Sequence, residues 1–315
     1  MNPSDADNAM VLQQAARTMA AGSRSFSLAS RLMDPRTREG TVLLYGWCRY
    51  CDDVIDGQTL GHDQRFGSRG NAADRLAQLQ ELTQAACAGR PGHDPVFQGL
   101  AEVVRRHSIP PALVMEHLAG FAMDVHGTHY ERLDDVLLYC WRVAGVVGVM
   151  MARIMGVAHE ETLDRACDLG LAFQLTNIAR DVLEDADIGR VYLPAEWLAA
   201  EGIAGVPELR AGANRAGLAR VAARLVDEAE PYYLSARVGI ADLPMRCAWS
   251  IATARSVYRR IGYEVVRRGA RAWDARVATG TSEKLWFLAR SAGVALAAPH
   301  LPRQPRDTRL FRRPL

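Results

Sequence analysis

The chain has 315 residues, of which 49% are hydrophobic and 23% are charged, a composition that is typical of folded globular proteins and excludes a disordered chain. Its 38 Lys and Arg residues nearly balance 36 Asp and Glu residues, so the net charge of +2 gives no reason to expect nucleic-acid binding. Six cysteines are too few for a disulfide scaffold and indicate a reducing compartment.

Apolar residues recur at helical spacing along almost the whole chain, whereas alternating strand patterns bounded by hairpin turns are hard to find. We therefore predict an all-α protein. The predicted helices cover residues 7–21, 35–56, 72–88, 96–107, 110–126, 133–157, 160–185, 210–236, 243–269 and 283–297. Residues 57–70, between the second and third of these helices, are rich in Gly, Asp and Ser and are interpreted as a loop that could act as a mobile flap.

No linker, composition shift or internal repeat divides the helical region, so we predict a single domain over residues 1–298. Residues 299–315 form a tail rich in Pro and Arg, which we expect to lie outside the core. Its arginines could attract an anionic membrane surface, and a solvated, disordered tail is the alternative. Five arginines of the tail accompany the single acidic residue Asp307: Arg303, Arg306, Arg309, Arg312 and Arg313.

The sequence also bears on localisation. The first residues offer neither a basic n-region nor an apolar h-region, so we expect no signal peptide. The longest apolar run, residues 143–152, is about half of the roughly 20 residues that a membrane-spanning helix needs. We expect a cytoplasmic protein that reaches the inner face of the membrane only peripherally.

Two clusters of carboxylates occur at helical spacing. In the first, Asp52, Asp53 and Asp56 follow Arg49 at offsets of three, four and seven residues, which predicts that all four side chains share one helical face. Each cluster alone could be an ordinary solvated helix face. The second cluster repeats the spacing after a strongly apolar segment, and consists of Gln174, Asn177, Arg180, Asp181 and Asp185.

The two clusters together indicate a magnesium-dependent diphosphate site. Asp52 and Asp56 lie one helical turn apart, as do Asp181 and Asp185, and like charges at that spacing destabilise a helix unless a cation offsets them. Mg²⁺ prefers oxygen ligands and typically bridges one or two carboxylates to substrate phosphates. Nearby arginines would bind the outer phosphate oxygens.

At this level of detail the chain resembles the squalene/phytoene synthase family, and within it the bacterial members that make phytoene. The resemblance extends from about residue 12 to residue 297 and rests on four ordered motifs, which lie at Gly22–Phe26, Trp47–Asp56, Leu138–Gly148 and Gln174–Asp185. Trp141 departs from the pattern, because many members of the family have Tyr at this position.

The resemblance implies a single-domain isoprenoid synthase bundle of helices around a central cavity. The implied activity is that of a prenyltransferase in carotenoid biosynthesis. It would condense two geranylgeranyl diphosphates head to head, through a cyclopropyl (prephytoene) diphosphate, into 15-cis-phytoene and diphosphate. Mg²⁺, or alternatively Mn²⁺, would be the cofactor, and no NADPH is expected. No protein partner is implied.

The resemblance also assigns the site residues. The implied metal ligands are Asp52, Asp56, Asn177, Asp181 and Asp185, and the four aspartates are also taken as catalytic together with Tyr139. The implied substrate-binding residues are Ser23, Ser25, Phe26, Tyr45, Arg49, Val143, Val147, Gly148, Gln174, Asn177, Arg180 and Tyr258.

Gly145 and Gly148 are three residues apart on an apolar helix. The preferred interpretation is that they leave room for a prenyl tail, with Val143, Val147 and Met151 as walls. The alternative is close packing of two helices at a patch of small residues.

One further motif resembles a metal site. Cys48 and Cys51 form a C-x-x-C pair, but no second pair completes a zinc site, so buried thiols are predicted. The alternatives for function are a squalene or dehydrosqualene synthase that uses farnesyl diphosphate, and a non-catalytic lipid-binding protein of the same fold.

Overall fold

The computed structural model describes residues 3–22, 27, 29–57 and 71–314, and within these ranges it contains helices and no strand. The α-helices are α1 (Pro3–Gly22), α3 (Pro35–Asp56), α4 (Ala72–Cys87), α5 (Pro95–Arg106), α6 (Pro111–Val125), α7 (Leu133–Cys140), α8 (Val146–Ile154), α9 (Glu160–Asp187), α10 (Ala195–Ala200), α11 (Val206–Arg210), α12 (Arg215–Gly239), α13 (Met245–Arg268) and α14 (Thr281–Ala297). This confirms the predicted all-α class. The flap predicted at residues 57–70 lies, after Gly57, outside the described residues.

Local signals explain where α3 begins and ends. The Asp34 side chain accepts a hydrogen bond from the backbone N–H of Thr37 at 3.1 Å, and Pro35 occupies the first helical position. Gly57 terminates the helix in a left-handed conformation with φ of 65°. The observed helix therefore has the predicted bounds.

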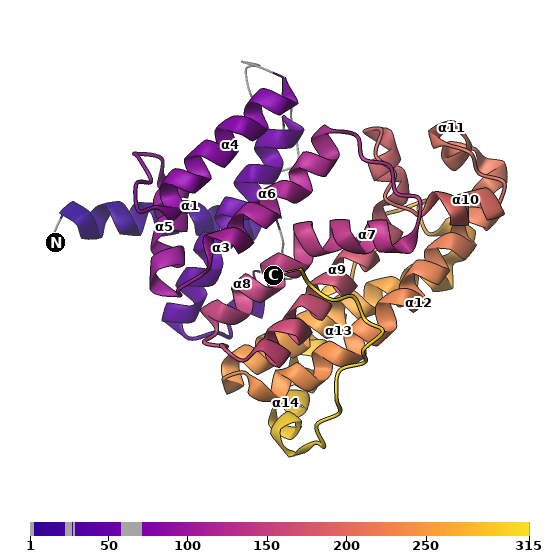
Figure 1. The fold of residues 1–315 in the computed structure, drawn as a ribbon. Coiled ribbons are helices and arrows are strands. Elements are labelled where there is room, and N and C mark those ends of the chain that lie inside the picture. Colours follow the sequence, from indigo (N-terminus) through magenta and orange to yellow (C-terminus); the bar gives the residue numbers. More distant parts are fainter. Residues whose placement is uncertain (1–2, 23–26, 28, 58–70, 315) are drawn as a thin grey trace.

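Helix α9 forms the centre of the bundle (Figure 1). It packs against α8, α12 and α13, and α13 also carries α14. The N-terminal helices α1, α3, α4, α5 and α6 form the other half of the molecule, and α7 and α8 lie between the two halves (Figure 1). The site described below lies between α3 and α9.

The helix predicted over residues 133–157 differs from a regular α-helix. A π-helical turn, η1 (Trp141–Gly145), separates α7 from α8. The whole segment Leu133–Ile154 is long and apolar enough to cross a membrane, but 61% of its most apolar window is buried inside the protein, as expected of a core helix. Sequence periodicity alone could not reveal the extra residue of the π turn.

The region before α12 also differs from the prediction. The structure places the short helices α10 and α11 there, and α12 begins at Arg215 rather than at Arg210. Helices of six and five residues are shorter than two turns, so they leave no periodic signal in the sequence.

The C-terminal tail packs on the helical bundle, contrary to the expectation that it lies outside the core. Arg306 binds the fully buried carboxylate of Asp168 on α9 with two hydrogen bonds of 2.9 and 2.7 Å. Leu310 is 6% exposed and belongs to the main hydrophobic core, and the Phe311 N–H donates to the hydroxyl of Tyr232 on α12. A buried carboxylate needs a partner, and the tail supplies it. The domain boundary at residue 298 stays a prediction.

Candidate active site

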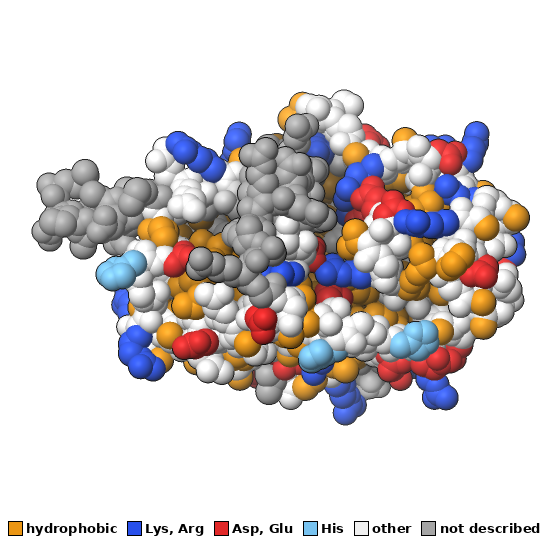
Figure 2. Space-filling model, turned by 90° about the horizontal axis from the view of Figure 1, so that it is seen from above, with side chains coloured by type: hydrophobic (Ala, Val, Ile, Leu, Met, Phe, Trp, Pro, Cys, Tyr) orange, Lys and Arg blue, Asp and Glu red, His pale blue; other side chains and the backbone are white. Residues whose placement is uncertain are grey.

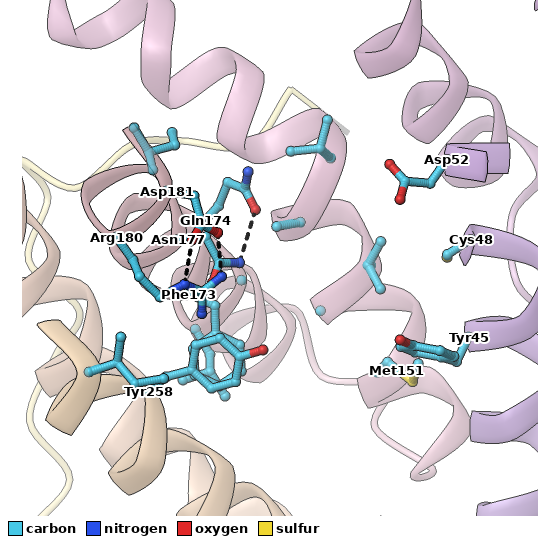
Figure 3. A pocket seen from close by; sticks show the side chains of 18 of the residues that line it. Tyr45, Cys48, Asp52, Met151, Phe173, Gln174, Asn177, Arg180, Asp181 and Tyr258 are labelled. Atoms are coloured by element: carbon cyan, nitrogen blue, oxygen red, sulfur yellow. Dashed lines mark hydrogen bonds and ion pairs between the residues drawn. The ribbon is translucent and has the colours of Figure 1, made fainter. Parts of the chain in front are cut away.

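A cavity of about 800 Å³ lies in the middle of the bundle. It is lined by residues of α3, α6, α8, α9 and α13, and Figure 3 shows α3 and α9 facing each other across it. One region of the lining is charged and the remainder is largely apolar. The cavity thus combines the two properties that a prenyl diphosphate requires.

Helix α3 contributes Asp52 and Asp56 to the cavity lining. The Arg49 guanidinium lies 2.9 Å from an Asp52 oxygen, and Arg190 lies 2.5 Å from Oδ1 of Asp56. Burial raises the pKa of Asp52 to about 6, a shift that Arg49 opposes and the carboxylate of Asp56 reinforces.

Asp53 does not share the face of α3 that Asp52 and Asp56 occupy, contrary to the prediction that all three lie on one face. It pairs with the second nitrogen of the same guanidinium, at 2.9 Å from Nη2 of Arg49, but it lines a second, smaller cavity beside α1 and α5. An offset of one residue turns a helical side chain by about 100°, so Asp52 and Asp53 cannot face the same cavity.

Helix α9 contributes Asn177, Asp181 and Asp185 at intervals of one turn. Asp181 is paired with Arg180, whose Nε lies 2.7 Å from Oδ1, and with Arg276 at 3.4 Å. Within the described residues Asp185 makes no ion pair and no side-chain hydrogen bond. Burial, followed by repulsion from Asp181, raises the pKa of Asp185 to about 8.

Both groups of carboxylates lie at unfavourable helix positions. Asp56 is the last residue of α3, and Asp185 lies in the last turn of α9, where neither helix carries a basic residue. A carboxylate near a helix C-terminus opposes the macrodipole at a cost of about 0.3–1 kcal/mol. Folding alone therefore does not favour these residues, whereas binding of a cation would.

The oxygen atoms of the site fit a divalent cation. Oδ1 of Asn177 is buried without a hydrogen-bond partner, one turn before Asp181, and the carboxylate of Asp185 follows one turn later. Across the described residues no group of three or more His, Cys, Asp and Glu side chains is close enough to form a closed metal site. An ion held here would therefore need oxygen ligands from bound substrate or water, as Mg²⁺ commonly has.

Aromatic hydroxyls and Asp124 form a network beside the carboxylates. Asp124 of α6 accepts hydrogen bonds from Tyr192 at 2.9 Å and from Tyr139 at 3.3 Å, and the two tyrosine rings stack at 4.5 Å. Burial raises the pKa of Asp124 to about 6 and holds the pKa of Tyr139 well above its usual range. Tyr139, predicted as catalytic, is therefore a neutral hydrogen-bond donor that is oriented by Asp124.

The apolar part of the cavity contains the other predicted substrate-binding residues. Tyr45 of α3 and Tyr258 of α13 lie on opposite sides, and the ring of Tyr258 stacks on that of Phe173 at 4.2 Å (Figure 3). Burial raises the pKa of Tyr45 to about 12. The remaining predicted residues that line the cavity are Val143, Val147, Gly148 and Gln174.

The two glycines of α8 and η1 serve mainly in helix packing. A Cβ on Gly148 would collide with the carbonyl oxygen of Ala166 and lie 3.1 Å from its carbonyl carbon, and a Cβ on Gly145 would lie 2.6 Å from Leu171. Both obstacles belong to α9. These contacts favour the alternative interpretation, close packing of two helices, although Gly148 also borders the cavity. That the missing side chains make room for a prenyl tail stays a prediction.

Some predicted features lie elsewhere. Ser23, Ser25 and Phe26 lie outside the described residues. Trp141 is fully buried and does not line the cavity, and its indole N–H donates to Glu116 at 3.3 Å. Cys48 and Cys51 form no disulfide, and burial raises the pKa of both thiols.

Several polar residues of the cavity were not predicted from the sequence. Asp124, Arg190 and Tyr192 were not selected, and neither were Arg276 and Lys284. Arg190 follows the second carboxylate cluster after five residues, so it carried a signal that could have been used. The other four were recognisable only from the fold.

Comparisons with known proteins identify the family of the chain. Residues 19–283 match the family model described as squalene/phytoene synthase. The chain is 53% identical to a 15-cis-phytoene synthase from Pantoea ananas over 98% of this chain and 100% of that protein, and 50% identical to one from a Paracoccus species over 86% and 89%. A crystal structure of a dehydrosqualene synthase has a TM-score of 0.81 at 25% identity, covering 92% of this chain and 98% of that one.

Proposed function

The chain belongs to the squalene/phytoene synthase family, and we propose that it joins two molecules of geranylgeranyl diphosphate head to head into 15-cis-phytoene. It is a prenyltransferase of the phytoene synthase type and acts on a prenyl diphosphate. The observation that carries the proposal is the pair of carboxylate clusters, one on α3 and one on α9, that line a single cavity whose remaining walls are largely apolar.

Mg²⁺, or alternatively Mn²⁺, is the proposed cofactor. Asp52 and Asp56 on α3, with Asn177, Asp181 and Asp185 on α9, would hold it. When bound, the ion neutralises charge on the diphosphate and so makes it a better leaving group. Formation of phytoene ends in loss of a proton, so the reaction needs no NADPH.

The basic side chains bind and orient the diphosphates. Arg49, Arg180 and Arg190 line the cavity next to the carboxylates, and Arg276 and Lys284 border it from the side of α14. Arginine donates two parallel hydrogen bonds to phosphate oxygens, so these residues can hold a diphosphate as it leaves. Positive charge that is positioned in advance favours departure of the leaving group.

The apolar walls protect the carbocations that follow. Phe121, Phe173 and Tyr258 present aromatic rings to the cavity, and a ring face stabilises a nearby cation. The same walls exclude water, which would convert the allylic cation into an alcohol. The hydroxyl of Tyr139 donates to Asp124, whose pKa of about 6 allows that carboxylate to accept a proton near neutral pH.

The proposed location is the cytoplasm, with peripheral contact to the inner membrane face through α14. Leu285, Trp286 and Leu296 are 58%, 57% and 62% exposed on that helix, and they follow Lys284 at the border of the cavity. A substrate and a product with long apolar chains would gain from such a surface.

We do not expect the C-terminal tail to be the main membrane anchor. Four of the five tail arginines are paired with carboxylates of this chain. The pairs are Arg303 with Asp242, Arg306 with Asp168, Arg309 with Asp307, and Arg313 with Glu160 and Asp164. Paired arginines have less charge to offer an anionic leaflet. On the face shown in Figure 2, acidic and basic side chains are interspersed, with no extended patch of one sign.

Liposome sedimentation tests the membrane contact. The double substitution Leu285→Ser and Trp286→Ser is expected to release the protein from anionic vesicles. Leu234→Ser, at a site that is 53% exposed on α12, serves as the matched control and should leave binding unchanged. Equal binding of all three proteins would contradict the role of α14.

A product assay tests the proposed reaction. Purified protein with Mg²⁺ is incubated with geranylgeranyl or farnesyl diphosphate, with and without NADPH, and the hydrocarbon is identified. We expect the wild-type protein to form phytoene without a reductant.

Asp52→Asn and Asp181→Asn should each lower kcat by at least about a hundredfold. Asp187→Asn, on α9 but away from the cavity, should keep normal activity. A product of 30 carbons only, or an active Asp52→Asn variant, would refute the proposal.

A further inference from the structure

The π turn in the middle of the α7–α8 segment leaves one backbone carbonyl without its usual partner. The N–H of Val146 donates to the carbonyl of Trp141, five residues earlier, instead of to that of Arg142, four residues earlier. Such turns insert one extra residue and are found frequently at functional sites. A buried carbonyl that lacks its helical donor needs another one.

His117 of α6 supplies that donor. Its Nδ1 lies 3.1 Å from the carbonyl oxygen of Arg142. Because a carbonyl only accepts hydrogen bonds, Nδ1 carries the proton and the tautomer of the ring is fixed. His117 is 3% exposed, and burial lowers its pKa to about 4, so the imidazole is neutral at physiological pH. A neutral ring can fill this position without a buried charge.

The residue before His117 holds the same turn from the side. Glu116 accepts hydrogen bonds from the Trp141 indole N–H at 3.3 Å and from Nε of Arg142 at 2.9 Å. Two consecutive residues of α6 therefore bind the first two residues of the π turn. Of these two residues, only His117 binds the backbone of the turn.

The π turn determines which side chains face the cavity. His117, Val143 and Val147 all line it, as does Met151 further along α8. Removing the extra residue of the turn would rotate α8 by about 100° relative to α7. With α7 held so that Tyr139 faces the cavity, Val147 and Met151 on α8 would then point away from it. Val143 is also closely packed against α6, because a Cβ added to Gly120 would lie 2.7 Å from Cγ1 of Val143.

We propose that His117 is a specificity-determining positioning residue, which holds the Arg142 carbonyl and thereby fixes the wall of the cavity that measures the length of the prenyl chain. The inference rests on the proposed function and deepens it. His117 acts through Val143 and Val147 and takes no part in the chemistry. Chain-length preference should therefore depend on a hydrogen-bond donor at the position of Nδ1.

Three substitutions separate the donor from the volume of the ring. His117→Asn keeps an N–H donor at the position of Nδ1, His117→Gln moves the donor outward by one bond, and His117→Leu removes it. His107→Leu is the matched control, because His107 is a half-buried histidine at the end of α5 that does not line the cavity.

The measured quantity is the ratio of the dissociation constants of the geranylgeranyl and farnesyl S-thiolodiphosphates, two analogues that do not react. We expect His117→Leu to change this ratio by about tenfold. His117→Asn and the His107→Leu control should stay within about threefold of the wild type, with His117→Gln between Asn and Leu. The ratio of kcat/KM for the two diphosphates should follow the same order.

The outcomes separate this inference from the proposed function. An unchanged ratio in all three His117 variants, or an equal change in the Asn and Leu variants, would overturn the inference. If the Leu variant does not fold, the Asn and Gln variants decide, because only Asn keeps the donor in place. Failure of the wild type to form phytoene would refute the proposed function, while the binding ratios would still test the role of His117.

Discussion

Gly148→Ala tests the close contact between α8 and α9. The new Cβ would lie inside 3.0 Å of the Ala166 carbonyl oxygen, a distance that real Cβ atoms do not show. The obstacle is backbone, so the two helices must move apart. Overpacking of this kind costs about 1–3 kcal/mol, and the better helix propensity of Ala returns up to about 1 kcal/mol. We expect a net loss of about 1–2 kcal/mol in the free energy of unfolding.

Thermal unfolding and steady-state kinetics measure the effect. A loss of this size lowers the melting temperature of a chain this long by about 2–3 °C. Because α9 carries Asn177 and Asp181, its displacement should reduce kcat/KM by the same factor for geranylgeranyl and farnesyl diphosphate. Gly293→Ala on α14 is the control: a Cβ there meets nothing within 4 Å, so the variant should be up to about 1 kcal/mol more stable. A Gly148→Ala variant that melts like the wild type and loses only the longer substrate would refute the packing argument.

Three further predictions concern charged groups. Asp185→Asn should abolish turnover yet raise the free energy of unfolding of the metal-free protein by about 1–3 kcal/mol, because it removes a buried carboxylate that repels Asp181. The control Asp187→Asn should change neither turnover nor stability. A destabilised Asp185→Asn variant would contradict this prediction. The pKa of Asp124 is raised from 3.8 to about 6 on folding, so its contribution to stability is complete below about pH 4 and is lost as the pH rises through 6. The difference in unfolding free energy between wild type and Asp124→Asn should therefore shift in favour of the variant by about 2 kcal/mol between pH 4 and 6 in chemical denaturation, and a constant difference would show that this carboxyl is not perturbed. Arg306→Ala should lower the unfolding free energy by about 3–5 kcal/mol in the same assay, because it leaves the fully buried carboxylate of Asp168 without its cation. Arg309→Ala, in the exposed part of the tail, should lower it by less than about 1 kcal/mol. Equal effects would place the tail outside the core.

The sequence was sufficient where the determinants are local. The bounds of α3 follow from Asp34, Pro35 and Gly57, which act within one turn of the helix ends. The carboxylates at intervals of one turn were recognisable as unusual because equal charges at that spacing are unfavourable, whatever the fold. Both the all-α class and the two halves of the polar site could therefore be predicted.

Residues that act through distant partners could not be assigned in this way. Asp124 and Tyr192 belong to the site because the end of α6 and the loop after α9 meet there, and no spacing in the sequence predicts this contact. The tail offered a pattern of arginines, but its partner Asp168 lies 138 residues earlier and is buried on α9.

The amino-acid sequence by itself determined most of the long helices, the carboxylate motifs and the chemistry that these imply, because each depends on neighbours within about two turns. Only the tertiary structure decided the role of Gly148, which depends on how closely Ala166 of α9 approaches. It also decided the tautomer of His117, which is fixed by a carbonyl 25 residues away. The physical reason is that packing distances and buried hydrogen-bond partners are properties of pairs of elements, and a periodic pattern describes only one element at a time.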